Sequence, residues 1–123
     1  METVPTDSPA DRMAYWKGGN ELLLASPLKS RVIRFDADTL ESRGIINSIF
    51  GVRTLAIDPI RNLLFCGSLT SGTVPIYDLA TGQRRISFYL GPWLRTIAIH
   101  PSSGTAYVSS NGALYKLSYG HLR

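Results

Sequence analysis

The chain has 123 residues, of which 44% are hydrophobic and 18% are charged, and its net charge is +4. This length allows one domain with a core of its own, and the composition excludes general disorder. No apolar run approaches the roughly 18 residues of a membrane span, and the first residues lack the basic start and apolar stretch of a secretory signal. We therefore expect a soluble protein, with its compartment unknown.

Cysteine, histidine and charge narrow the function classes further. The one cysteine, Cys66, excludes an intrachain disulfide framework, and two histidines far apart give no metal-ligand spacing, so we expect no metal and no cofactor. Residues 79–123 hold five basic residues and no acidic one, whereas residues 1–78 have a net charge of −1. Such a basic third can mark a surface for an anionic partner; the alternatives are contact with acidic protein outside this chain and simple solvation of the charges. Nucleic acid is not expected, because no recognised motif or basic run is present.

The N-terminal part of the chain predicts a tail followed by short strands. Residues 1–9 are expected to form a flexible tail, and residues 10–50 a first unit. Within this unit, Asp11–Trp16 takes the place of a first strand with a degenerate sequence. A last strand is expected at Glu41–Ile46.

The middle of the chain, residues 51–92, predicts four strands. They are Val52–Ile57, Leu63–Ser68, Thr73–Tyr77 and Gln83–Phe88. Asp58-Pro59 ends the first of them, because proline cannot donate to a strand ladder.

The C-terminal part, residues 93–123, predicts three strands and lacks a fourth, outer one. The three are Leu94–Ile99, Thr105–Ser110 and Ala113–Leu117, with Asn111-Gly112 as a two-residue hairpin turn whose positions tolerate positive φ.

These three units are copies of one repeat with a period of 42 residues. The segment Val52-Arg53-Thr54-Leu55-Ala56-Ile57-Asp58-Pro59 falls on Leu94-Arg95-Thr96-Ile97-Ala98-Ile99-His100-Pro101, and Asn20–Ser26 falls on Asn62–Ser68 at the same offset. Four short antiparallel strands in about 42 residues match one β-propeller blade. The predicted fold class is therefore all-β, a propeller-like array of about three blades of which the last is incomplete.

Particular segments resemble known propeller blades. Gly72-Thr73-Val74-Pro75-Ile76-Tyr77-Asp78-Leu79-Ala80-Thr81-Gly82 resembles blades of the YVTN and NHL type, and Ala106-Tyr107-Val108-Ser109-Ser110-Asn111 resembles the strand that names the YVTN group. The resemblance implies the fold without implying one function, since these families include scaffolds, ligand binders and some lyases and lactonases. It also implies that the face near the mouth of the central channel binds ligands and partners.

Three blades are fewer than the four to eight of a closed propeller. A blade buries its faces only against neighbours, so the ends of the array need a partner. Three solutions stay open: the chain is a piece of a longer propeller, two chains complete a six-bladed ring, or the N-terminal tail fills the gap.

Two arginines are the first candidate site residues. Arg53 and Arg95 are equivalent in the repeat and are expected side by side near the channel mouth, where two guanidinium groups could hold a carboxylate or phosphate. The alternative is structural pairing with neighbouring carboxylates or carbonyls.

Four further residues complete the predicted site. Trp93 could be an exposed anchor for a partner or a packing residue between blades, and Phe50 holds the corresponding connection one repeat earlier. Ser68 and Thr70 offer hydroxyl groups in the loop after the second strand of the middle copy.

Other polar residues are interpreted as turn caps. Asp36 and Asp78 stand in Asp-x-x-Thr turns, and His100 takes the place of Asp58 in a turn before proline. No catalytic residues are predicted, so the leading function is a non-catalytic binding or scaffold module for a protein or small anionic ligand. There are two alternatives. The chain could be part of a propeller lyase or hydrolase whose catalytic residues lie on other blades, or a structural piece that completes a ring.

Overall fold

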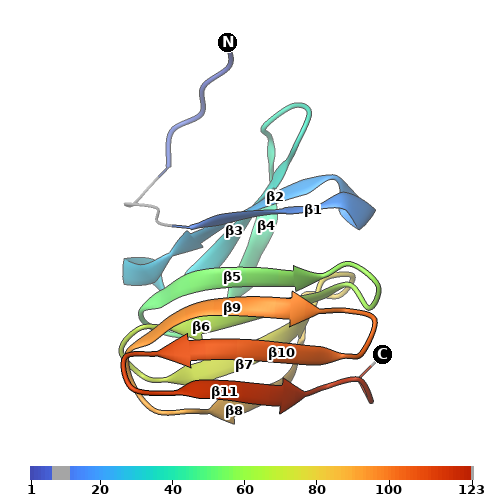
Figure 1. Cartoon of the computed structure of the whole chain (residues 1–123). Helices are drawn as coiled ribbons and strands as arrows, with labels where there is room; N and C mark the ends of the chain where they lie inside the picture. The colour runs from blue at the N-terminus through green and yellow to red at the C-terminus, as the bar shows by residue number, and fades with distance from the viewer. Residues whose placement is uncertain (7–11, 123) are drawn as a thin grey trace.

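The computed structural model describes residues 1–6 and 12–122, and in this part of the chain it contains eleven β-strands (Figure 1). The strands are β1 (Met13–Trp16), β2 (Glu21–Ser26), β3 (Arg31–Asp36), β4 (Ser42–Asn47), β5 (Val52–Asp58), β6 (Leu63–Ser68), β7 (Thr73–Asp78), β8 (Arg84–Tyr89), β9 (Leu94–His100), β10 (Thr105–Ser110) and β11 (Leu114–Ser118). Two single 3₁₀ turns, η1 (Lys17–Gly19) and η2 (Pro27–Lys29), lie in the first unit. The predicted strands Leu63–Ser68 and Thr105–Ser110 have these bounds, and the bounds of the others differ by one or two residues. The predicted tail and first strand include residues 7–11, which lie outside the described part.

The strands form three antiparallel sheets, each made of strands consecutive in the chain. The first sheet has the order β1-β2-β3-β4 and the second the order β5-β6-β7-β8. The third sheet, β9-β10-β11, has three strands within the described residues. The structure therefore confirms the all-β prediction of a propeller-like array with an incomplete last unit.

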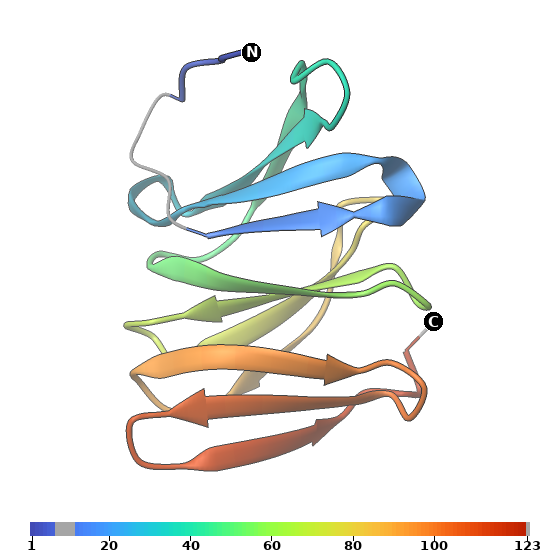
Figure 2. The same ribbon diagram turned by 45° about the horizontal axis from the view of Figure 1, so that its top comes forward.

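The sheets lie one after another, with their first strands side by side. Figures 1 and 2 show β1, β5 and β9 running next to one another, and β5 contacts both of the other two. Each following strand of a sheet lies farther from this row. This is the arrangement of propeller blades, whose innermost strands line a central axis.

Two seams of buried side chains hold the three sheets together. The seam between the first and second sheets contains Leu23, Val32 and Ile46 from the first and Leu64 and Cys66 from the second. The seam between the second and third sheets is built on residues such as Phe65, Ile76, Val108 and Tyr119. The strands β6 and β7 face both seams, which is why β6 is buried along its whole length.

The turns follow the predicted capping pattern. The Oδ1 atom of Asp36 accepts hydrogen bonds from the backbone N–H groups of Asp38 and Thr39 at 2.8 and 3.0 Å. Asp78 Oδ1 accepts the equivalent pair from the N–H groups of Ala80 and Thr81 at 2.8 and 3.2 Å. His100 Nδ1 lies 2.6 Å from the Ser103 Oγ, inside the turn after β9. The prediction that these residues cap turns is confirmed.

The hairpin at Asn111-Gly112 forms with a different backbone geometry from the one its sequence favours. Neither residue has positive φ. Instead, the Ser110 hydroxyl accepts the N–H groups of Gly112 and Ala113 at 3.3 and 3.1 Å, and a serine turn replaces the type I′ geometry.

No helix in the described residues is long and apolar enough to cross a membrane.

Candidate functional site

The two predicted arginines occupy equivalent β-bulges at the start of their strands. In β5, Val52 pairs with Ser68 and Thr54 with Gly67, so that Arg53 is the extra residue between them. In β9, Arg95 is the extra residue between Leu94 and Thr96 in the same way. A bulge adds one residue and turns its side chain out of the regular alternation. Both arginines therefore leave their sheets at the same place in the repeat.

The same end of the sheets carries two adjoining clefts. The smaller, about 60 Å³, is lined by Arg12, Arg53, Leu69, Leu94 and Arg95. The larger, about 240 Å³, extends from Arg12 and Arg95 along the inner strands past Thr54 and Thr96. The structure thus brings Arg53 and Arg95 together and adds Arg12, which the sequence had not indicated.

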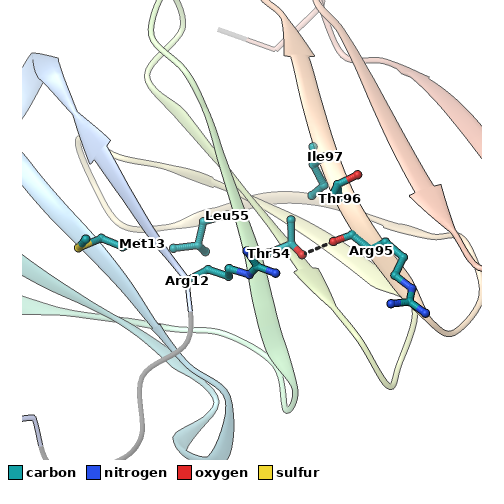
Figure 3. A pocket seen from close by; sticks show the side chains of 7 residues that line it. All are labelled: Arg12, Met13, Thr54, Leu55, Arg95, Thr96 and Ile97. Carbon is teal, nitrogen blue, oxygen red and sulfur yellow. Dashed lines mark hydrogen bonds between the residues drawn. The ribbon is translucent and has the colours of Figure 1, made fainter.

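The larger cleft lies across the row of inner strands, as Figure 3 shows. Arg12 lies beside Thr54, between β1 and β5, and Arg95 projects from β9 on the other side of Thr54. Thr54 Oγ1 donates to the Arg95 carbonyl oxygen at 2.9 Å and ties the two strands together. Arg95 Nε donates to Asn111 Oδ1 at 2.8 Å, which orients its guanidinium group. The positive charges are thus spread along the cleft and do not meet at one point.

Arg12 was missed because the first copy of the repeat is degenerate at this position. Its counterpart at an offset of 42 is Thr54, so the repeat pattern gives no reason to expect an arginine there. The available signal was its place within the first predicted strand, Asp11–Trp16, a place that precedes the observed start of β1 at Met13.

Trp93 is half exposed and has an unusual backbone conformation. Its φ is +68°, and its counterpart one repeat earlier is Gly51, with φ +79°. Both residues make the same contact to the preceding unit: Gly51 N–H donates to the Pro27 carbonyl at 3.2 Å, and Trp93 N–H donates to the Leu69 carbonyl at 2.8 Å. The turn therefore requires a left-handed residue, and in one of its two copies that residue is tryptophan.

The remaining predicted site residues differ in their access to solvent. Phe50 is 60% exposed, and Thr70 is exposed in the loop after β6. Ser68 is fully buried; its Oγ donates to the Phe50 carbonyl at 2.9 Å and accepts the Ser71 N–H at 3.1 Å. The structure accordingly places Ser68 as a support for the Phe50 turn and leaves Phe50, Thr70 and Trp93 at the surface.

A buried polar network between the second and third sheets was also missed. Asp58 has no exposed surface, and its carboxylate accepts the Tyr119 hydroxyl at 2.5 Å and the Arg61 Nη1 at 3.1 Å. Arg61 Nη1 also donates to the Pro101 carbonyl at 2.7 Å, and its guanidinium lies over the Tyr119 ring. The sequence reading treated Asp58 only as the end of a strand, because its partner is 61 positions away.

This network fixes the protonation of both of its acidic groups. Burial raises the pKa of Asp58, but hydrogen bonds from Tyr119 and Arg61 outweigh it and hold the pKa below its ordinary value. Burial, together with the Asp58 carboxylate, raises the pKa of Tyr119 well above that of a free tyrosine. Asp58 is therefore an ionised carboxylate that accepts a hydrogen bond from the neutral Tyr119 hydroxyl. We call this Asp58–Tyr119 pair, which joins the second and third sheets, the latch.

Four of the five basic residues of the last third lie on three different strands. Arg84 and Arg85 lie on β8, Arg95 lies on β9 and Lys116 lies on β11. Arg123 is outside the described residues. In residues 1–6 and 12–122, no three histidine, cysteine, aspartate or glutamate side chains lie close enough to hold a metal ion.

Comparison with known proteins identifies the fold. No family model and no curated protein matches the chain. Among solved structures, it superposes on a chain of Kuenenia stuttgartiensis hydrazine synthase with a TM-score of 0.85 and 24% identity over 98% of its own length. The β-propeller domain of Myceliophteria thermophila Cps50 (Swd1) gives 0.77, with 11% identity over 95%. A chain of the mitotic checkpoint complex gives 0.75, with 21% identity over 94%.

The chain spans only 36%, 41% and 37% of the lengths of these three structures. At identities this low, the likeness shows the fold and not the activity. The YVTN or NHL subtype remains a prediction. Together with the three sheets and their row of inner strands, the comparison establishes a β-propeller fold, represented here by an arc of three blades.

Proposed function

We propose that the chain is a non-catalytic binding module that holds an acidic segment of a partner protein against Arg12, Arg53 and Arg95. The observation that carries this proposal is the pair of equivalent bulges, which direct two arginines into adjoining clefts at one end of the sheets. Arginine suits this task because its planar guanidinium group matches a carboxylate with two parallel hydrogen bonds.

The spacing of the charges favours a peptide over a single small anion. Arg12 and Arg95 lie on either side of Thr54 along a cleft that crosses β5 and β9. A single phosphate or carboxylate could engage one end of this row. An extended segment with several carboxylates could engage both ends at once, and each further contact lowers the dissociation rate of the whole segment.

The exposed aromatic residues support a protein partner. Trp93 and Phe50 stand at equivalent connections next to the two arginine strands and are 52% and 60% exposed. Tryptophan is among the residue types that most often anchor protein interfaces, and arginine is another. A left-handed tryptophan costs backbone energy, so a role at the surface gives a reason for its presence.

The experiment is a calorimetric titration of the chain with a short polyglutamate peptide. Replacing both bulge arginines (Arg53→Ala with Arg95→Ala) is expected to weaken binding about tenfold, or about 0.7 kcal/mol for each arginine. The wild-type affinity should also fall as salt is raised, because exposed charges are screened.

The matched control removes the same charge elsewhere. Arg84→Ala with Arg85→Ala changes two arginines of β8 that line neither cleft, and it should leave the affinity close to that of the wild type. Unchanged binding by the Arg53/Arg95 variant would refute the proposal. Loss of its cooperative thermal unfolding would instead support the structural role of these arginines.

A further inference from the structure

The two ends of the array carry the two halves of a seam that the chain already forms inside itself. That seam lies between the first and second sheets. The second sheet contributes Leu55, Ile57, Leu64, Cys66 and Tyr77 to it. The first sheet contributes a face that includes Leu23 and Val32, with the Arg34 guanidinium beside them donating to the Leu79 carbonyl at 2.7 Å.

The outer face of the first sheet repeats the contribution of the second sheet. Subtracting 42 from the five residue numbers above gives Met13, Tyr15, Leu22, Leu24 and Phe35. The strand register pairs Met13 with Leu24, Tyr15 with Leu22, and Leu22 with Phe35, so all five side chains share one face. This set, the first-sheet end face, is entirely apolar.

Among the sheets of the described residues, none packs against the first-sheet end face. Met13 is 62% exposed and Tyr15 is 52% exposed, whereas every one of their five counterparts in the second sheet belongs to a packed seam. Pro5 and Thr6 share a cleft with Phe35 of this face and with Ile45. An apolar face of this kind marks an interaction site.

The outer face of the third sheet resembles the face that the first sheet contributes to the internal seam. Ala98 pairs with Tyr107 and Tyr107 with Lys116, and Ser109 pairs with Leu114 on the same face. We call Ala98, Tyr107, Leu114 and Lys116 the third-sheet end face. Matched by strand register, their counterparts in the covered face of the first sheet are, in the same order, Ala14, Leu23, Val32 and Arg34. The offset is 84 for the first two and 82 for the last two, because by register the hairpin joining β10 and β11 is two residues shorter than the hairpin joining β2 and β3.

The correspondence holds at these four positions: a small residue, two apolar residues and one cation. It does not extend to Trp16 and Ile46 of the internal seam, because His100 takes the place of Trp16 and the third sheet has no fourth strand within the described residues. Leu114 is 75% exposed and Tyr107 is 39% exposed, while Leu23 and Val32 are fully buried by the second sheet. The third-sheet end face therefore resembles the covered face of the first sheet, and the first-sheet end face resembles the surface of the second sheet on which that covered face packs. Both end faces belong to the same chain.

We propose that two copies of this chain associate head to tail, with the first-sheet end face of each against the third-sheet end face of the other. Two such contacts close a ring of six sheets, within the four to eight blades of known propellers. The contact is heterologous, so it closes only if the rotation between sheets matches the ring. The proposal does not depend on the binding function proposed above.

The internal seam also predicts a specific contact in the new one. Arg34 donates to the carbonyl of Leu79, and the counterpart of Leu79 is Ala37. The equivalence is local as well, because the N–H groups of Leu79 and Ala37 donate to the carbonyls of the equivalent residues Asn62 and Asn20. Lys116 should therefore reach the Ala37 carbonyl of the second copy.

The test measures molar mass by light scattering for the full chain and for one variant of each end face. The wild type is expected at about 27 kDa, twice the 13.5 kDa of one chain. Met13→Glu and Leu114→Glu each replace a residue more than 60% exposed, so both variants should fold, and each alone should be a monomer. Ile60→Glu, at a turn residue that is 65% exposed and part of neither face, should stay a dimer.

Mixing the two variants distinguishes this arrangement from the others. Each variant keeps the end face that the other has lost, so an equimolar mixture should form a heterodimer through one intact seam. Lys116→Glu provides a second third-sheet variant should Leu114→Glu lose its far-ultraviolet circular dichroism spectrum.

Four results would overturn the proposal. The first three are a wild-type monomer, a polydisperse series of larger species, and a dimer that persists in Leu114→Glu and Lys116→Glu. A persistent dimer of this kind would mean that two first-sheet end faces pair with each other. A mixture of Met13→Glu and Leu114→Glu that stays monomeric would count against it equally.

Discussion

At the scale of single residues, two side chains sit where local rules disfavour them. Trp93 adopts φ +68° at a turn position that holds glycine in the preceding copy, and Asp58 is a carboxylate with no exposed surface. A left-handed conformation costs a non-glycine residue about 1–3 kcal/mol, and a buried charge is tolerated only when it is paired. Asp58 has its partners inside the fold, whereas Trp93 points to a role at the surface.

The first residue-scale prediction concerns Trp93→Gly. Glycine adopts φ near +70° without strain, so the variant should unfold at the same denaturant concentration as the wild type or a higher one. If Trp93 anchors a partner, affinity for the acidic peptide should fall while stability does not. A variant that is destabilised by more than about 1 kcal/mol would show that Trp93 is a packing residue.

The second concerns Tyr119→Phe, which deletes the hydroxyl donor to Asp58. Removing a charge-assisted hydrogen bond from a buried carboxylate should lower the free energy of unfolding by about 1.5–3 kcal/mol at neutral pH. Urea unfolding measured across a range of pH gives this difference between the variant and the wild type.

The sign of the pH dependence follows from the two pKa shifts. Because the pKa of Asp58 is lowered in the folded protein, its full contribution to the free energy of unfolding is present above the ordinary carboxyl pKa of about 3.9. This contribution is lost as the pH falls through the lower folded pKa. Because the pKa of Tyr119 is raised in the folded protein, its full contribution to the free energy of unfolding is present below the ordinary tyrosine pKa of about 10. This contribution is lost as the pH rises through the higher folded pKa. The difference between variant and wild type should therefore be largest between these limits and smaller beyond both. A difference independent of pH would contradict the assignment of the latch.

At the scale of elements, the strands and turns followed from the repeat, and the contacts between sheets did not. Alternation and turn residues gave strand bounds such as Leu63–Ser68 and Thr105–Ser110 as observed. Local signals cannot show which distant residue a side chain will meet. The Asp58–Tyr119 bond and the approach of Arg12 to the other arginines depend on how sheets are rotated against one another, which no periodicity encodes.

The repeat did predict one part of the site, and the reason is geometric. Arg53 and Arg95 are equivalent because both copies have the same bulge after the same turn. Ser68 illustrates the limit of this reasoning. Its position in a loop suggested access to a ligand, but its hydroxyl is used by the Phe50 carbonyl and the Ser71 N–H.

The element-scale prediction concerns Gly72→Ala, in the turn between β6 and β7. Gly72 has φ +72°, and a Cβ there would lie 2.0 Å from the Gly91 carbonyl oxygen in the connection between β8 and β9. The backbone of one turn would have to move, so the variant should lose at least about 2 kcal/mol of stability. Denaturant unfolding provides the measurement.

Gly112→Ala is the matched control. Gly112 lies in the hairpin between β10 and β11, has no positive φ, and has no heavy atom within 4 Å of a built Cβ. Its substitution should change stability by less than about 0.5 kcal/mol. Equal effects of the two substitutions would contradict the close packing of the β6–β7 turn on the β8–β9 connection.

At the scale of the whole molecule, the three sheets behave as units whose stability comes from the seams between them. A unit in such an array contacts only its neighbours, so the outer faces of the first and last units leave apolar side chains exposed. The inner strands β1, β5 and β9 bring one end of every sheet to a common place, which is where the arginine clefts lie. The two proposed tasks therefore fall on different surfaces: recognition at the strand ends and association at the sheet faces.

The central claim is that recognition takes place at the arginine clefts. The most direct measurement is a two-dimensional ¹H–¹⁵N nuclear magnetic resonance titration of the wild-type chain with the polyglutamate peptide, observing backbone amides and arginine Nε–H groups. We predict that the Nε–H signals of Arg53 and Arg95, and the amides around Trp93, shift first and saturate together. Shifts confined to Arg84 and Arg85 on β8, or no shift at any arginine, would contradict the account.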